Sequence, residues 1–428
     1  MNQLATAISN PDPYYLDSVT EFSVTNEVVS NDDIYSQSGI KLINQGTRLN
    51  KSFYERLIRH KLAIQPIDRS LTVKDAVTPH SLALDAALLL DEEVQLTRLA
   101  NALPDALLLR HTLAQITLNS TLAFKLTLAR ETRPSLYLHS IRIALICLYL
   151  GACINLRRED LLALATAAVF HDLGELHIDP ALLNPARILD AQERQHIYAH
   201  PMISYLILRE YPEYHPTISH AVLEHHERLD GSGYPRNVKG AKISVLGQIL
   251  AVAELAGSLC GGTDPDNACA RVEVILKLNS NQFRGDLMKY LLALGKQDHT
   301  PGVPENLPRI RATLANIAQV LAAWNQTYAP YRAAKPPEYL AYASERMASL
   351  EKSLFDAGFN PDELDTLTHN IEEDPRSLAE LDIMVREAGW QMKGAIYEIR
   401  RRWPEFESAA DPAALALRSW VSLAEQLL

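Results

Sequence analysis

The sequence predicts a mainly α-helical protein with a small N-terminal α+β module and a C-terminal helical extension. Apolar residues recur at helical spacing from about residue 71 onward. Leucine and alanine are abundant while aromatic residues make up only 7% of the chain, a composition that favours helices. An alternating, glycine-containing stretch that is typical of strands lies near the N-terminus.

A length of 428 residues is long for one domain and indicates two or three. We expect a flexible tail over residues 1–20, the α+β module over 21–70, a helical domain over 71–300 and a C-terminal helical region over 309–428. Within the module, IYSQSGIKLINQGTRLN at 34–50 predicts a short hairpin. Asn50 then has the position of an N-cap for a helix over 51–62.

The helical domain contains the longest apolar stretch of the chain, 14 residues at 143–156. A membrane span needs about 20 residues, so we expect a buried core helix here and no membrane partner. A segment with three prolines, at 299–308, has the composition of a linker. The helices expected after it carry no chemical motif and are interpreted as an interaction or capping region.

The charge pattern excludes some partners. The formal net charge is −11 and no long basic stretch occurs, so a nucleic acid polymer is not expected to bind. Binding of a small anionic ligand is still compatible with the negative net charge, because a pocket lined by cationic side chains or metal ions attracts an anion locally. The four cysteines form no CxxC pair, and the N-terminus lacks the features of a signal peptide. We therefore expect a reduced, cytoplasmic protein.

Histidines are concentrated in one part of the chain. Nine of the 14 lie between His139 and His226, where uniform scatter would place about three. Helix surfaces that happen to use histidine would explain this, but metal coordination explains it together with the neighbouring carboxylates at the ends of apolar segments. The candidate ligands are His139, His171, Asp172, His200, His225, His226 and Glu254. Seven ligands suit two divalent ions that share a carboxylate. We interpret His177, His196, His215 and His220 as solvent-facing.

The order of these residues resembles the HD-GYP family of the HD phosphohydrolase superfamily. The resemblance covers roughly residues 120–300 and rests on LHS, HDLGELHIDPALLNP, ERQHIYAHP, EHHERLDGSGYP and ILAVAE. It implies an HD-type helical bundle core, two or three iron or manganese ions, and hydrolysis of cyclic di-GMP. It also implies that His139, His171, Asp172 and Glu254 hold one metal, and that Asp172 bridges to a second held by His200, His225 and His226.

The sequence departs from the family pattern at several positions. Glu175 stands where the family has a lysine, and Glu254 stands where it has an aspartate. The family's basic positions after that acid are Thr263 and Asp266 here, and Ser135 replaces the acid that binds a third metal. We therefore expect two divalent ions, iron or manganese. Arg228, Arg236, Lys239 and Lys242 are candidates to replace the lost positive charge.

Two sets of residues are predicted to act on the substrate. Asp172 and Glu175 are the candidate catalytic residues, and Glu175 is either a further metal ligand or a surface residue. The resemblance implies a substrate-binding role for the loop residues Asp230, Gly233, Tyr234, Pro235 and Arg236, although Asp230 also suits a tight turn and Tyr234 also suits plain loop packing.

Three functions are compatible with this pattern. The first is a metal-dependent phosphodiesterase for cyclic di-GMP or a related cyclic dinucleotide. The second is a catalytically degenerate receptor or scaffold that binds nucleotide or a diguanylate cyclase domain. The third is an HD hydrolase of another phosphoester. A homodimer is among the assemblies that we expect.

Overall fold

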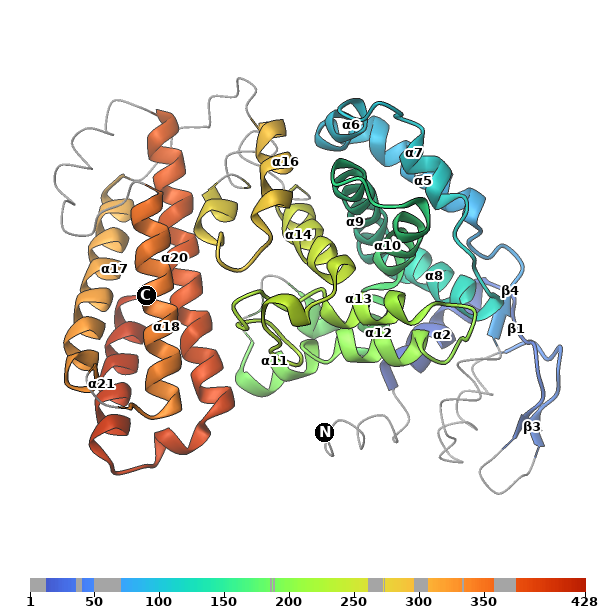
Figure 1. Ribbon diagram of the computed structural model, residues 1–428. Coiled ribbons are helices and arrows are strands. Elements are labelled where there is room, and N and C mark those ends of the chain that lie inside the picture. The colour runs from blue at the N-terminus through green and yellow to red at the C-terminus, as the bar shows by residue number, and fades with distance from the viewer. Residues whose placement is uncertain are drawn as a thin grey trace. The chain divides into compact units, whose positions relative to one another are not determined.

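The computed structural model describes residues 13–35, 41–49, 71–184, 187, 189–260, 272, 274–295, 307–332, 335–357 and 375–428. The chain divides into two compact units, residues 1–257 and 258–428 (Figure 1). The predicted fold class is confirmed, because helices form most of both units and the described strands are short.

The first described element is helix α2, Pro13–Thr25, which corrects the expected flexible tail over its last residues. Tyr15 and Leu16 are buried, and the Tyr15 ring stacks on the His177 imidazole with 4.7 Å between centroids. The Lys125 ammonium lies 4.1 Å from the centre of the same tyrosine ring. These tertiary contacts hold residues 13–20 in an ordered helix, while residues 1–12 lie outside the described part.

The α+β module contains two small antiparallel sheets. The hairpin prediction is confirmed by β2 (Ile34–Tyr35) and β3 (Lys41–Ile43), in which Ile34 pairs with Ile43. The other sheet pairs β1 (Val28–Ser30) with β4 (Leu71–Val73), so the chain returns to the start of the module before the helical region begins. The predicted helix over 51–62 and its cap, Asn50, lie outside the described residues.

The remainder of the first unit is helical. Its α-helices are α5 (Pro79–Glu92), α6 (Val94–Asn101), α7 (Leu108–Leu113), α8 (Ser120–Thr132), α9 (Pro134–Cys153), α10 (Arg158–Phe170), α11 (Ala191–Ile197), α12 (His200–Leu208), α13 (Pro216–Glu224) and α14 (Val245–Cys260). Three short 3-10 helices join them: η1 (Leu173–His177), η2 (Pro180–Leu183) and η3 (Gly240–Lys242).

Helix α9 is the centre of this unit. It is apolar on nearly all sides, and such a helix is stable in water only when neighbouring helices cover it. Among the described residues it is the one helix long and apolar enough to suit a membrane span, but 67% of that apolar window is buried inside the unit. The expected core helix is therefore confirmed, and it ends at Cys153. Helices α8 and α10 pack on it.

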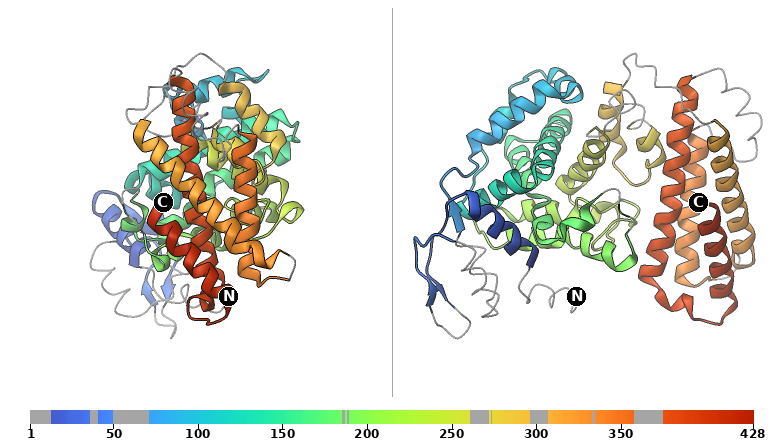
Figure 2. Two further views of the ribbon diagram at one scale, coloured as in Figure 1. Left: turned by 90° about the vertical axis from the view of Figure 1, so that its left-hand side faces the viewer. Right: turned by 180° about the vertical axis from the view of Figure 1, so that it is seen from behind.

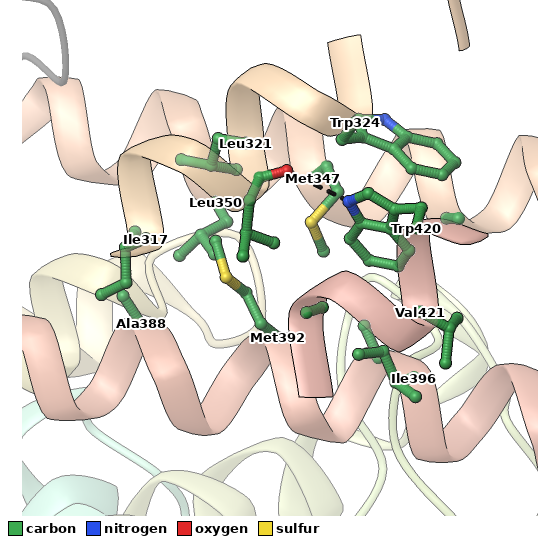
Figure 3. Close-up of a cluster of buried hydrophobic side chains, with 14 of the residues drawn as sticks. Ile317, Leu321, Trp324, Met347, Leu350, Ala388, Met392, Ile396, Trp420 and Val421 are labelled. Atoms are coloured by element: carbon green, nitrogen blue, oxygen red, sulfur yellow. Dashed lines mark hydrogen bonds between the residues drawn. The ribbon is translucent and has the colours of Figure 1, made fainter. Parts of the chain in front are cut away.

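The second unit contains a bundle of four described α-helices, α17 (Leu307–Tyr328), α18 (Glu338–Asp356), α20 (Pro375–Arg402) and α21 (Pro412–Leu427). They lie alongside one another in all three views (Figures 1 and 2). Trp324 and Trp420 meet edge to face at 4.9 Å in the core, and the Trp420 indole donates a hydrogen bond to the Val320 carbonyl at 3.1 Å (Figure 3). Helix α16 (Gly285–Gly295) and the 3-10 helices η4 (Ala329–Tyr331) and η6 (Pro404–Glu407) also belong to this unit.

The division between the units differs from the expected one near residue 300. It falls after Gly257, within α14, because the segment beyond that helix packs with the C-terminal region. Val274 and Leu278 belong to the same buried cluster as the bundle helices. Residues 299–306 of the expected linker lie outside the described part of the chain.

Candidate metal centre

The seven candidate ligands come from the ends or the interior of five different helices. His139 lies on α9, His171 and Asp172 follow α10, and His200 begins α12. His225 and His226 follow α13, and Glu254 lies on α14. The fold brings the side chains into two groups: His139, His171, Asp172 and Glu254, and Asp172, His200, His225 and His226. The potential ligand atoms within each group lie within 4.8 Å of one another.

The first group is centred on Glu254. Its Oε2 lies 2.9 Å from His139 Nε2 and 3.2 Å from His171 Nε2. Asp172 Oδ2 completes the group at 3.0 Å from His171 Nε2 and 3.7 Å from His139 Nε2. Two carboxylates and two imidazoles therefore face one point.

The second group uses the other oxygen of Asp172. Asp172 Oδ1 lies 3.2 Å from His200 Nε2 and 3.4 Å from His225 Nε2. These two imidazole nitrogens are only 3.0 Å apart, and the His226 ring lies 4.2 Å from the His225 ring between centroids. The carboxylate of Asp172 is thus shared by the two groups, with one oxygen directed to each.

The hydrogen bonds of three histidines fix which nitrogen is available to a metal. Nδ1 of His171, His200 and His225 lies 2.7, 2.7 and 2.6 Å from the backbone carbonyls of Ala168, Ile197 and Val222. A carbonyl accepts only, so Nδ1 carries the proton in each neutral ring and Nε2 presents a lone pair. This arrangement is the usual support for a metal-binding imidazole.

The donor set fits divalent cations. With the tautomers above, the lone pairs of His200 and His225 face each other at 3.0 Å, and both face the Asp172 carboxylate. Asp172 Oδ1 is a buried acceptor with no hydrogen-bond donor among the described residues. Acceptors that converge in a buried site repel one another unless cations lie between them. Mixed imidazole and carboxylate ligands suit iron, manganese or zinc.

Without metal, the electrostatics of the centre depend on protons. Burial disfavours charge on His139 and His171, but the carboxylates of Glu254 and Asp172 outweigh it and raise the pKa of both imidazoles. Burial likewise opposes charge on Asp172, yet His171 and its neighbours hold the pKa of this carboxyl well below its usual range. Burial lowers the pKa of His225 to about 4, which keeps that ring neutral and ready to coordinate.

Glu175 lies on η1 but belongs to neither ligand group. Its side chain is half-buried, and burial together with the nearby Asp172 charge raises its pKa to about 7. The predicted catalytic or metal-binding role of Glu175 therefore stays a prediction. The Arg133 guanidinium nearby donates to the backbone carbonyls of Glu175 and Ile178, so it fixes the path of η1.

Gly174 allows η1 to lie directly against the start of α12. Its amide donates a hydrogen bond to Ser204 Oγ at 2.7 Å. A Cβ at this position would lie 2.2 Å from the His200 carbonyl oxygen, which is backbone and has little room to move. The glycine therefore sets the spacing between Asp172 and His200.

We expect Gly174→Ala to displace His200 and to weaken metal binding by at least about 10-fold, the size of effect seen when the support of a metal ligand is lost. Isothermal titration with Mn²⁺ measures this change. Gly285→Ala is the matched control, because nothing lies within 4 Å of a Cβ built there. Unchanged Mn²⁺ affinity in Gly174→Ala would contradict the assigned spacing role.

The two glutamates that flank the histidine pair organise the loop after α13. Glu224 accepts hydrogen bonds from the Ser244 amide at 2.8 Å and the Arg236 guanidinium at 2.7 Å. Glu227, which is also buried, accepts from the amide of Arg236 at 2.7 Å and from that of Val238 at 3.2 Å. Arg236, expected to bind substrate, is therefore paired with a buried carboxylate in this structure.

The other loop residues predicted to bind substrate have identifiable structural roles. Asp230 Oδ1 accepts from the Ser232 amide at 2.8 Å in a tight turn, and Gly231 has a φ of +77°. A Cβ on Gly233 would lie 2.3 Å from the His226 carbonyl oxygen, so the loop closes onto the histidine pair at this glycine. Pro235 follows a cis peptide bond from Tyr234. Contact of these residues with substrate stays a prediction.

Tyr234 contacts the candidate ligands through its ring. It stacks on His226, with 4.6 Å between centroids and 24° between planes. Its ring also stacks on Tyr198, at 3.9 Å and 12°. Sequence reasoning missed Tyr198, because a tyrosine two residues before a candidate ligand carries no signal of its own. It also missed Glu224 and Glu227, although two acidic residues beside a histidine pair were a visible signal.

Four further histidines were interpreted as solvent-facing. This is confirmed for His196, His215 and His220, which are exposed. It is wrong for His177, because its ring is covered by Tyr15 and its Nε2 atom is buried. Thr263 and Asp266, where basic residues were missing from the pattern, lie outside the described residues.

Comparisons with known proteins agree with this geometry. Residues 123–284 match the family described as HD domain. A 3'3'-cGAMP-specific phosphodiesterase of Vibrio cholerae is 32% identical over 121 residues, 28% of this chain and 26% of that protein. A cyclic di-GMP phosphodiesterase of Thermotoga maritima is 38% identical over 89 residues, 21% of this chain and 24% of that protein. The chain therefore spans about a quarter of the length of these curated relatives.

Proposed function

We propose that the chain, whose residues 123–284 match the HD domain family, is a metal-dependent phosphodiesterase of the HD-GYP type that hydrolyses a cyclic dinucleotide. Cyclic di-GMP is the first candidate substrate. The observation that carries the proposal is the shared carboxylate of Asp172, which directs one oxygen to each of two ligand groups.

The two groups are suited to phosphodiester hydrolysis. When bound, two divalent ions would supply activated water and would neutralise charge on the phosphoryl oxygens. Asp172 would hold both sites at a fixed separation, and the carbonyl-bound imidazoles of His171, His200 and His225 would keep their Nε2 atoms directed inward. Hydrolysis breaks one phosphorus–oxygen ester bond in line with the attacking water and opens the cyclic dinucleotide to a linear one.

Charges beside the ligand groups determine how well a dianionic substrate binds. The Arg236 guanidinium is engaged by Glu224, which leaves less positive charge for phosphate than the sequence suggested. Lys239 and Lys242 are exposed on the same loop, and Arg228 lies beside the histidine pair, where burial lowers its pKa. We propose that these three side chains supply the remaining attraction for phosphate.

A panel of substrates tests the proposed activity. One relative is named as specific for 3'3'-cGAMP and another as a cyclic di-GMP phosphodiesterase, so both dinucleotides belong in the panel. Manganese- or iron-loaded protein is incubated with each dinucleotide and with a linear phosphodiester, and products are separated by chromatography. Opening of a cyclic dinucleotide supports the proposal. Cleavage of the linear diester alone would identify a hydrolase of another phosphoester.

Substitution of Glu175 tests whether its negative charge opposes binding of the substrate phosphates. Burial raises the pKa of Glu175 to about 7, so the carboxylate would repel a phosphate at a pH well above 7, where a charge-assisted contact is worth about 1.5–3 kcal/mol. We therefore expect Glu175→Gln to lower KM for the dinucleotide by about 10-fold, which corresponds to 1.4 kcal/mol. Steady-state kinetics separate KM from kcat, with Glu159→Gln on the exposed face of α10 as control. A loss of bound metal in Glu175→Gln would instead assign Glu175 as a metal ligand.

The second candidate function is a receptor or scaffold without turnover. The pairing of Arg236 with Glu224 favours it, together with the acidic Glu175 in place of a lysine. Such a protein would bind a cyclic dinucleotide or a diguanylate cyclase domain and leave the nucleotide intact. Tight binding with no product from metal-loaded protein would support it. Assembly as a homodimer and a cytoplasmic location stay predictions.

A further inference from the structure

The ring of His226 is held differently from the other imidazoles of its group. His200 and His225 each direct Nδ1 to a backbone carbonyl. His226 makes no ring hydrogen bond to a described residue, and its ring packs against the rings of His200, His225 and Tyr234. A metal-binding imidazole usually needs a second contact to fix its orientation. For His226 this contact is the face of Tyr234.

Tyr234 is in turn fixed by Tyr198. The two phenol rings are nearly parallel, at 12° and 3.9 Å between centroids, so the three rings form a continuous stack from Tyr198 to His226. Tyr234 belongs to the loop after α13, whereas Tyr198 belongs to the turn between α11 and α12. The stack therefore joins two segments that are distant in the sequence.

The backbone of Tyr198 is held by hydrogen bonds at the end of α11. It terminates α11, and its amide donates to the Arg194 carbonyl at 2.9 Å. The other end of α11 is closed by a capping box, in which Asp190 Oδ1 accepts from the amides of Gln192 and Glu193 at 2.8 Å. Two residues after Tyr198 the chain places His200 in the same ligand group.

We propose that Tyr198 is a positioning residue for the group formed by Asp172, His200, His225 and His226. It acts through Tyr234 and orients the His226 ring by stacking, in place of the hydrogen bond that the neighbouring histidines have. The proposal rests on the two-metal function proposed above. Truncation of Tyr198 should leave the group of His139, His171 and Glu254 unchanged.

The first test needs neither metal nor turnover. Histidine side chains are labelled with ¹³C, and ring resonances are recorded in metal-free protein, with His226 assigned from a His226→Gln variant. Tyr198→Ala should shift or broaden the His226 signal, because the Tyr234 ring loses its support, while the His171 signal stays in place. Tyr198→Phe keeps the stacked ring and should restore the wild-type spectrum.

The second test measures metal affinity. Mn²⁺ titration of wild-type protein should show two sites. Tyr198→Ala should weaken the Mn²⁺ affinity of one site by about 10-fold, which is the smaller end of the loss seen when a residue that orients a metal ligand is mutated. Tyr198→Phe should bind as wild type. Tyr205→Ala is the matched control, because Tyr205 is a half-buried tyrosine of α12 whose ring contacts His220 outside both groups.

The outcomes separate this proposal from the function on which it rests. An unchanged His226 signal in Tyr198→Ala overturns the positioning role, whatever the metal data show. Equal weakening of both sites, with a shifted His171 signal, also overturns it and assigns Tyr198 a general structural role. Absence of two sites in wild-type protein contradicts the two-metal function, whereas the spectra of metal-free protein still decide the role of Tyr198.

Discussion

Replacing Asp172 with asparagine is expected to remove both metal ions and to lower hydrolysis by roughly 10²–10⁴-fold. The side chain is buried and each of its oxygens faces a different ligand group, so one substitution removes a negative ligand from both. Loss of one partner from a buried charged cluster costs about 3–5 kcal/mol, which corresponds to this range of rates. Metal analysis of the purified protein and product assays measure the two effects.

The control for this substitution is Asp91→Asn, which makes the same chemical change at an exposed position of α5. It should retain two metals and full activity. The shared role of Asp172 would be contradicted if Asp172→Asn kept one tightly bound ion, because the carboxylate would then serve a single group. His196→Gln, at an exposed histidine, controls for metal held at the protein surface.

Chelation of the metals is expected to lower the thermal midpoint of the first unit, with a larger effect at higher pH. A ligand at about 100 times its Kd stabilises the folded state by about 2.7 kcal/mol per site. Two sites would therefore contribute about 5 kcal/mol, or on the order of 10 °C for a domain of this size. Calorimetry of manganese-loaded and chelated protein measures the difference.

The pH dependence follows from the charges of the metal-free centre. Burial opposes protonation of His139 and His171, but the neighbouring carboxylates outweigh it and raise the pKa values of both rings above the usual 6.5. These protonated rings contribute stability that is fully present below pH 6.5 and is lost as the pH rises through the raised values. Metal binding requires deprotonated ligands and improves over the same range.

The gap between loaded and chelated protein should therefore widen as the pH increases from below 6.5 to well above it. In Asp172→Asn the gap should be small throughout, because little metal binds. A gap in the wild-type protein that stays constant or narrows with pH would contradict the assigned protonation of the metal-free histidines.

Much of the candidate site could be predicted from the sequence, because metal ligands follow from residue type and order. Several candidate ligands lie at the end of an apolar segment or within one: His171 and Asp172, His225 and His226, and Glu254. This position predicts that their side chains meet inside the fold. The structure brings all seven candidates together and divides them at Asp172. Their binding of metal remains part of the proposed function.

The rest depends on tertiary contacts that a single sequence does not reveal. Residues 13–20 were expected to be flexible, but a stack of Tyr15 on His177 fixes them. Arg236 was expected at the substrate, but a carboxylate 12 positions earlier in the chain pairs with it. Tyr198 has no periodicity or motif, and its role is visible only through the ring of Tyr234.

Product analysis with cyclic di-GMP tests the proposed phosphodiesterase activity directly. Protein purified without oxygen and loaded with iron or manganese is incubated with the dinucleotide beside Asp172→Ala, and metal content is measured in both. We expect linear dinucleotide or GMP from the wild-type protein and none from the variant. Intact dinucleotide after incubation with wild-type protein that holds two metals would contradict the phosphodiesterase and favour a binding role.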